Sequence, residues 1–314
     1  MSTETQAGRV APDAVLIKSR KARGWAALLI VWVVWGSTYF AIRVAVESLP
    51  PLLMAGGRFV LAGLILFPFA VRGGRPSRAQ WLGCALVGTL MLGANGALSF
   101  AEKTVPSGLA SLLIATVPLW LLSMDGALNR MRLGWKQVLG LLIGLGGVGL
   151  LSGTMSGSVS LAGVVICLLA AVSWALGTVL SRRVPMPGNP VLGSAMEMIT
   201  AGVVLLCSAA ISGEAGSFHP AAVSGRSWLA LAYLVAVGSL VGFSAYVVAI
   251  RLLPTATVAT YAYVNPVIAV LLGTTLLGER LSPSMFFGGA LIVGAVVLVV
   301  IRPAPPAEQP QSRQ

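Results

Sequence analysis

The sequence predicts an all-α integral membrane protein with ten transmembrane helices arranged as two inverted five-helix halves. Three observations lead to this fold class: an unusually apolar composition, apolar runs of membrane-spanning length, and landmark residues that recur in both halves. Of the 314 residues, 57% are hydrophobic and 10% are charged, whereas an average soluble domain has about 25% charged residues. So few charges cannot cover a soluble surface of this size, but a bilayer accepts apolar surface.

Apolar runs of about 20 residues, the length that spans a bilayer, recur ten times along the chain. They cover approximately residues 25–46, 51–71, 80–100, 105–125, 135–153, 160–181, 190–211, 227–249, 255–277 and 284–301. Short connections rich in Pro or Gly separate them. We therefore expect a first repeat over residues 24–153 and a second over 160–301. A basic tail, residues 1–23, precedes them, and a Pro-rich tail, residues 302–314, follows.

The basic residues predict the orientation of these helices. With the N-terminus in the cytosol, only Lys103, Arg226 and Arg280 fall in outer loops, and Arg43 and Arg58 fall inside helices. All the other Lys and Arg residues then lie on the cytosolic side, as the positive-inside rule requires. Both termini are therefore predicted to be cytosolic, in a multi-pass protein of the cell (inner) membrane.

Landmark residues repeat between the halves. A shift of 139 residues places Trp35 on Trp174, and a shift of 148 residues places Pro118 on Pro266. Each half has an odd number of predicted helices, so the second half enters the membrane from the opposite face. Inverted repeats of this kind place a substrate site near the midplane, where the halves meet.

Other classes of protein fit the sequence less well. The net charge of +12 could indicate nucleic-acid binding, but the basic residues lie at the ends of apolar runs rather than in a stripe with aromatics, so no nucleic-acid partner is expected. A membrane enzyme would need a metal cluster or an activated nucleophile, and the single histidine, His219, falls in an outer loop. We therefore expect no enzyme activity, metal or cofactor.

Two charges at membrane depth are candidates for gating or coupling. Arg58 lies in the second predicted helix, and Glu197 lies at the equivalent position of the seventh. Charges at this depth usually face the protein interior, so each could polarise one mouth of a pathway, and Glu197 could carry a proton. Alternatively, each is a structural anchor bonded to nearby polar groups. Arg43, four residues before Glu47, either extends to the lipid headgroups or helps to form an outer gate.

Aromatic and polar residues near the midplane are the candidates for a substrate cavity. Such a cavity combines apolar walls with a few polar groups, and its aromatic faces also bind organic cations. The alternative for the aromatic residues is lipid-facing packing. The candidates are Trp35, Thr38, Tyr39, Asn95, Trp120, Trp174, Thr178, Tyr246, Tyr261, Tyr263 and Asn265.

Two features suggest how the helices bend and pack. Pro118 and Pro266 each leave a helix carbonyl without its usual donor, so we expect kinks, which act either as hinges for alternating access or as static bends. Glycine-rich runs around Gly144 and Gly288, in the fifth and tenth predicted helices, favour close helix packing. These helices could form a dimer contact, so the protein is expected to be a monomer or a possible homodimer.

Motifs in six of the ten predicted helices, and in loops that follow them, match one known family. They are Trp35–Arg43, Glu47–Pro51, Met54–Phe59, Val105–Gly108, Ala115–Leu119, Ser173–Ala175, Glu197–Met198, Ala201–Gly202, Tyr261–Pro266 and Gly278–Glu279. On these residues the sequence resembles the drug/metabolite transporter superfamily, specifically its EamA family, and within it the YedA-type exporters. One departure is that Asn129, Arg130 and Met131 stand where the family often has Gly-Glu, so this Glu occurs only as Glu279.

The resemblance implies ten helices and a central cavity lined mainly by helices 1, 3, 4, 6, 8 and 9. It also implies a secondary transporter that exports small metabolites or drugs across the plasma membrane by alternating access. The alternative is a facilitator or importer of amino acids or similar small solutes. The implied partners are the lipid bilayer and a small-molecule substrate.

Overall fold

The computed structural model describes residues 12–71, 75–128, 135–153, 159–253, 255–258 and 260–300, which form helices and turns without a strand. The first half contains α1 (Pro12–Ala45), α2 (Pro51–Ala70), α3 (Arg78–Ala101), α4 (Ser107–Ile114), α5 (Val117–Leu128) and α6 (Trp135–Gly153). The second half contains α7 (Leu161–Leu180), α8 (Pro190–Ile211), α9 (Glu214–Ser217), the short 3₁₀ turn η2 (Pro220–Ala222), α10 (Gly225–Tyr233), the π-helical η3 (Leu234–Val241), α11 (Gly242–Leu252), α12 (Thr255–Val258), α13 (Tyr261–Leu276) and α14 (Pro283–Val300).

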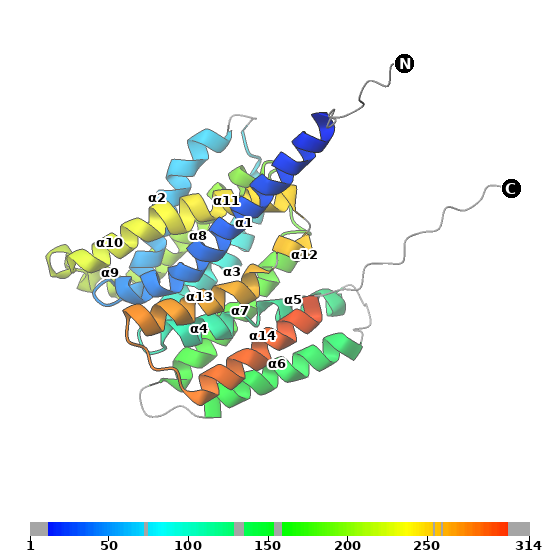
Figure 1. The fold of residues 1–314 in the computed structure, drawn as a ribbon. Coiled ribbons are helices and arrows are strands. Elements are labelled where there is room, and N and C mark those ends of the chain that lie inside the picture. The colour runs from blue at the N-terminus through cyan, green and yellow to red at the C-terminus, as the bar shows by residue number, and fades with distance from the viewer. Residues whose placement is uncertain are drawn as a thin grey trace, which may run out of the picture.

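The long helices form one bundle in which α1 begins and α14 ends at the same end (Figure 1). We call this the terminal end and the opposite one the far end. Six helical stretches in the described ranges are long and apolar enough to span a membrane, and four apolar helices are shorter. The long stretches are Arg20–Ala45, Pro51–Ala70, Arg78–Ala101, Leu161–Leu180, Pro190–Ile211 and Gly225–Leu252. The shorter helices are Ser107–Leu121, Val138–Leu150, Tyr261–Leu276 and Pro283–Leu298.

The all-helical fold is therefore confirmed, with helices of membrane-spanning length, while the count of ten spans and the cytosolic termini stay predictions. Part of the predicted basic tail is helical, because α1 begins at Pro12 and continues the first span into this segment. Ala, Leu, Lys and Arg favour helix, so a helix that starts in the apolar span continues easily through them. Residues 1–11, 302–314 and the loop residues Asn129, Arg130 and Met131 lie outside the described residues.

Two predicted spans are interrupted. The span over residues 105–125 is divided because α4 ends at Ile114 and α5 begins at Val117. Pro118 has no N–H for the carbonyl of Ile114, which explains the position of the break. The span over residues 227–249 contains the π-helical η3, a rare geometry that often marks functional sites.

The helices α2 and α8 pack through small residues, and each contact made by a glycine of one helix has an equivalent contact made by a glycine of the other. A Cβ atom on Gly63 would lie 2.9 Å from the carbonyl oxygen of Ala195, and one on Gly202 would lie 2.9 Å from that of Gly56. The shift of 139 residues exchanges these two contacts. They also require the helices to run antiparallel, which is the arrangement expected of an inverted repeat.

The helices α6 and α14 pack in a similar way at the edge of the bundle (Figure 1). A Cβ atom on Gly147 would lie 2.8 Å from the carbonyl oxygen of Gly288, and one on Gly144 would lie 3.5 Å from Ala295. Part of the glycine-rich face predicted as a possible dimer contact is therefore used inside the chain. A Cβ on Gly146 or Gly149 would meet nothing within 4 Å.

Candidate functional site

A cavity lies between the two halves, with walls from both. It contains about 890 Å³ of atom-free space when the open solvent at its mouth is counted, and the centre of a water molecule can occupy about 100 Å³ of it. The lining residues come from α1, α2, α3, α4, α5, α7, α11 and α13. Predicted helices 1, 3 and 6 correspond to α1, α3 and α7; predicted helix 4 corresponds to α4 and α5, predicted helix 8 ends with α11, and predicted helix 9 contains α13. All six helices implied by the family resemblance therefore line the cavity, and α2 is added. The lining residues are Trp35, Thr38, Tyr39, Arg58, Phe59, Leu92, Ala94, Asn95, Leu98, Ser111, Ile114, Ala115, Val117, Pro118, Ala170, Trp174, Phe243, Tyr261, Ala262, Asn265 and Pro266.

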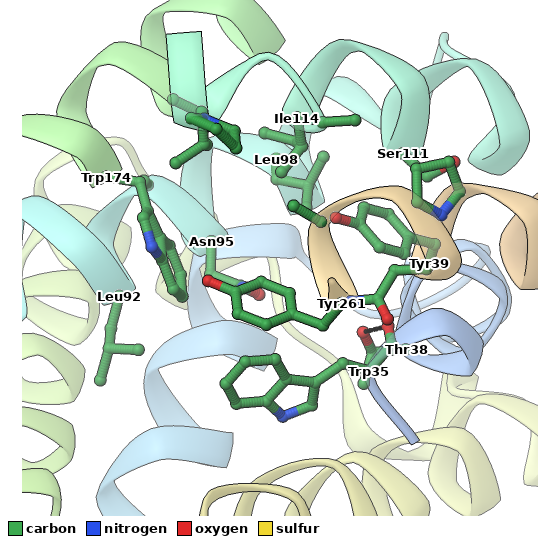
Figure 2. A pocket seen from close by; sticks show the side chains of 18 of the residues that line it. Trp35, Thr38, Tyr39, Leu92, Asn95, Leu98, Ser111, Ile114, Trp174 and Tyr261 are labelled. Carbon is green, nitrogen blue, oxygen red and sulfur yellow. Dashed lines mark hydrogen bonds between the residues drawn. The ribbon is translucent and has the colours of Figure 1, made fainter. Parts of the chain in front are cut away.

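Aromatic rings form one wall of this cavity. The Trp35 ring lies edge-on to Phe243 and Tyr261, with centroids 5.3 Å away in each case. Tyr246 supports it from behind at 5.1 Å. Figure 2 shows Asn95 between the rings of Trp174 and Tyr261. The repeat-related pair Trp35 and Trp174 therefore contributes to the same cavity, one residue from each half.

Arg58 is the buried cation of the cavity, with 3% of its surface exposed. Its Nε donates to the Ser239 hydroxyl at 2.9 Å, and an Nη donates to Oδ1 of Asn95 at 3.4 Å. Its guanidinium carbon lies 4.8 Å from the centre of the Phe59 ring. These partners are neutral groups. The charge thus lies at the cavity wall without a carboxylate among its hydrogen-bond partners in the described residues.

The π-helical η3 places the Ser239 hydroxyl against Arg58. Gly238 lies beside it, and a Cβ atom there would come within 3.2 Å of an Arg58 nitrogen. The altered turn of η3 therefore provides both the hydrogen-bond acceptor and the space that the guanidinium needs. Sequence reasoning identified Arg58 but missed Ser239, because nothing in an apolar run marks a π-helical turn.

Asn265 holds α13 against α1 at the cavity. It is 6% exposed, and its amide nitrogen donates to the carbonyls of Trp32 and Tyr261 at 3.2 Å each when the amide is oriented to satisfy both. Thr38 donates to the carbonyl of Trp35 at 2.6 Å. Asn265 and Thr38 therefore have internal partners.

Four of the predicted cavity residues are not among those that line the cavity. Trp120 donates through Nε1 to Thr116 at 3.1 Å, and Thr178 donates to the carbonyl of Trp174 at 2.9 Å. Tyr263 packs in the cluster around Leu119. With Tyr246 they lie outside the lining set, although Tyr246 contacts Trp35 directly.

Glu197 lies outside the cavity, in the α8 segment that crosses α3. A Cβ atom on Gly88 would come within 2.6 Å of its backbone carbonyl, and the side chain is half-buried. No ion pair in the described residues joins it to Arg58, which donates to Ser239 and Asn95. The two repeat-related charges therefore lie at separate places, and their roles in gating or coupling stay predictions.

The two repeat-related prolines both line the cavity but affect their helices differently. Pro118 follows the break between α4 and α5, whereas Pro266 lies inside the continuous helix α13. Their role as hinges stays a prediction.

At the far end, two glutamates of the second half cap helices of the first. Oε1 of Glu279 accepts from the backbone N–H and the hydroxyl of Ser107, both at 2.8 Å, and Oε2 accepts from the N–H of Gly108 at 3.1 Å. Oε2 of Glu214 accepts from the N–H groups of Leu52 and Leu53 at 2.8 and 3.2 Å. Carboxylates at helix N-termini satisfy free donors and complement the helix dipole.

Comparison with known proteins decides the family. The model of the EamA-like transporter family matches residues 22–153 and, a second time, residues 161–301. The chain belongs to the EamA-like transporter family. The resemblance inferred from the motifs is thus confirmed. Membership makes the chain a multi-pass inner-membrane protein of a transporter family and points away from an enzyme.

Individual relatives agree with this assignment. The inner membrane transporter YedA of Escherichia coli (strain K12), described as uncharacterized, is 42% identical over 283 residues, which are 88% of this chain and 90% of that protein. A probable amino-acid metabolite efflux pump of the same strain is 28% identical over 88% of this chain and 94% of its own length. A solved crystal structure with 22% identity covers 90% of this chain and 96% of its own, with a TM-score of 0.60, and supports the fold.

Proposed function

We propose that this EamA-family transporter exports small metabolites or drugs by alternating access through the cavity between its halves. The observation that carries the proposal is that Trp35 and Trp174, related by the repeat, line the same cavity. A site shared by two inverted halves can be exposed first on one side and then on the other. In this arrangement the terminal end faces the cytosol and the far end faces outward.

The size of the cavity favours small substrates. One water needs roughly 10–15 Å³ of space for its centre, so the 100 Å³ in this cavity holds several waters. A solute of amino-acid size fits this space without a large rearrangement, whereas a multi-ring drug requires the walls to move apart.

The chemistry of the cavity favours a substrate that carries a carboxylate and an apolar or cationic part. Arg58 offers a buried guanidinium whose hydrogen-bond partners among the described residues are neutral, and guanidinium groups bind carboxylates through paired hydrogen bonds. The faces of Trp35 and Trp174 suit an apolar side chain or an ammonium group. Amino-acid-like zwitterions match both features, and one relative is named as a probable amino-acid metabolite efflux pump.

The experiment uses a panel of L-amino acids, their decarboxylated amines and amphipathic organic cations. Thermal stabilisation of the purified chain selects ligands, and flux in proteoliposomes then gives their direction with and without a pH gradient. We expect amino acids to stabilise the protein more than the matching amines, because only the amino acids engage Arg58. Loss of a hydrogen bond to a charged group costs about 1.5–3 kcal/mol, so Arg58→Gln should weaken amino-acid binding by roughly 10- to 100-fold.

A matched pair of tryptophan variants tests the site itself. Trp174→Phe changes the cavity wall, whereas Trp228→Phe changes a ring that packs on Phe218 at the far end. Only the first should alter ligand affinity. Equal effects of both, or no flux of any panel member, would contradict the proposal. Flux only down the solute gradient into the cell would favour the facilitator or importer instead.

A further inference from the structure

Glu102 is a buried acid that the cavity does not explain. It follows the last residue of α3, is 0% exposed, and neither of its carboxylate oxygens has a hydrogen-bond partner in the described part of the chain. A buried carboxylate normally has a cation or several N–H donors around it. The ionised form is therefore poorly accommodated here, whereas a protonated carboxyl group would be neutral.

The charged groups around Glu102 do not compensate for its charge. Arg43 of α1 donates to the backbone carbonyl of Glu102, and no described ion pair joins its guanidinium to the carboxylate. Glu279, which follows α13, adds a second negative charge nearby, although its own oxygens are bound to the N-terminus of α4. Lys103 is exposed to solvent.

The remaining titratable neighbours, Tyr39 of α1 and Cys167 of α7, are buried and provide no positive charge. Glu102 lies outside the apolar span that ends at Ala101. Burial raises the pKa of the Glu102 carboxyl well above its usual range; Glu279 raises it further, and Arg43 opposes the shift.

We propose that Glu102 is a proton-binding site of this transporter, occupied in the conformation described here. When the far end opens, external water reaches the carboxylate, and a proton from that water forms an O–H bond with one carboxylate oxygen. The group is then neutral and is buried as the far end closes. When the terminal end opens, the O–H bond breaks and the proton passes to water on the cytosolic side, so one proton moves inward in each cycle.

One face of α3 connects Glu102 with the cavity. Asn95, Ser99 and Glu102 are spaced by four and three residues, so they lie on the same side of the helix. The Ser99 hydroxyl donates to the backbone carbonyl of Asn95 at 2.8 Å, and the side-chain Oδ1 of Asn95 accepts a hydrogen bond from Arg58. Tyr39, which lines the cavity, packs in the same buried cluster as Ala101, the residue before Glu102.

This connection makes Glu102 a candidate to couple substrate movement to protons, a role that rests on the proposed export function. It also changes the place where coupling is expected. The sequence suggested Glu197, but Glu197 is half-buried beside α3, whereas Glu102 is enclosed completely.

Infrared spectroscopy of the purified full chain in liposomes tests the site without any substrate. A protonated carboxyl group has a C=O stretch that differs from that of a carboxylate and shifts in D₂O. We expect wild type to retain this band at neutral pH, Glu102→Gln to lose most of it, and the control Glu197→Gln to keep the part that belongs to Glu102. If Glu102→Gln does not fold, Glu102→Asp must show the band at a shifted frequency.

Two results would overturn the proposal: a wild-type spectrum without the band at neutral pH, or a band of equal intensity in Glu102→Gln. Because this measurement needs no transported solute, it stands apart from the export assay. A retained band together with absent export would contradict the proposed function alone. For coupling, flux of a panel amino acid should respond to a pH gradient in wild type and lose that response in Glu102→Gln.

Discussion

The cap that Glu279 places on α4 should be a measurable source of stability between the two halves. The N-cap residue of this helix, Pro106, provides no side-chain hydrogen bond, so the carboxylate of Glu279 supplies the cap from the other half. Gly273 provides the space for this carboxylate, because a Cβ atom at position 273 would come within 2.4 Å of Oε2 of Glu279. The positive φ of 66° at Gly278 turns the chain just before the glutamate.

The informative change is Glu279→Gln, which preserves size but removes the charge. Its amide oxygen can replace Oε1 on Ser107, but its NH₂ group then faces the N–H of Gly108, so two donors oppose each other. A hydrogen bond to a charged group contributes about 1.5–3 kcal/mol, and a charge at a helix N-terminus about 0.3–1 kcal/mol. The expected loss is therefore about 2–4 kcal/mol.

Glu214→Gln is the matched control, because a single oxygen of Glu214 accepts both N–H groups at the start of α2. The amide oxygen of Gln can keep both bonds, so only the helix-dipole contribution of about 0.3–1 kcal/mol should be lost. Reversible unfolding in mixed detergent micelles measures both changes. Equal losses in the two variants, or a loss below about 1 kcal/mol for Glu279→Gln, would refute this reasoning.

Three further predictions concern the cavity and its surroundings. The Cβ atom added by Gly242→Ala would lie 2.6 Å from Nε1 of Trp35, so this variant should lose about 1–3 kcal/mol of unfolding free energy in the same assay and bind ligand more weakly. Gly57→Ala is the control, because its Cβ meets nothing within 4 Å. It should leave the unfolding free energy unchanged or raise it by up to about 1 kcal/mol. Arg58→Lys keeps the charge but loses the planar fork, so calorimetry should show weaker amino-acid binding; unchanged affinity would exclude paired hydrogen bonds. The raised pKa of Glu102 means that the folded state holds the extra proton. The unfolding free energy should therefore fall by about 1.4 kcal/mol per pH unit as the pH rises above 4.5, the ordinary pKa of a glutamate, until the pKa of the folded state is passed, and Glu102→Gln should lack this slope.

Much of the architecture could be predicted because the landmarks are chemically unusual in apolar helices. The pair Trp35 and Trp174 identified residues that line one cavity, and Pro118 marked the place where a helix breaks. Gly63 and Gly202 matched in sequence and proved to make equivalent contacts between α2 and α8. Few residues can replace a tryptophan, a proline or a closely packed glycine. A match between the halves at such a residue therefore indicates equivalent positions in the fold.

The faces of the helices were harder to predict. In a membrane helix both the lipid-facing and the protein-facing sides are apolar, so the amphipathic pattern that orients a helix in a soluble protein is weak. Trp120 and Tyr263 were therefore predicted as cavity residues from their type, together with Trp35, yet neither is among the residues that line the cavity. Phe243 lines it and was missed, because one phenylalanine in an apolar run has no distinguishing context.

The surroundings of charged residues at helix ends were also not predicted from the sequence. Glu102 directly follows an apolar run and precedes Lys103, which is the pattern of a solvated loop. Its complete burial comes from the packing of α1 and α7 around the end of α3, and this depends on long-range contacts. Arg43 likewise turns inward to the carbonyl of Glu102 instead of reaching the headgroups or pairing with Glu47.

Export by alternating access requires one cavity that opens alternately to the two sides of the membrane. Ala262→Cys places a thiol on the cavity wall in a chain whose exposed native Cys207 has been replaced by Ser. A membrane-impermeant maleimide is applied to sealed vesicles from the outside or the inside, with Cys84 and Cys167 buried in the background. We predict labelling of this thiol from either side, slowed by a ligand that stabilises the protein; labelling from one side only, under all conditions, would contradict alternating access.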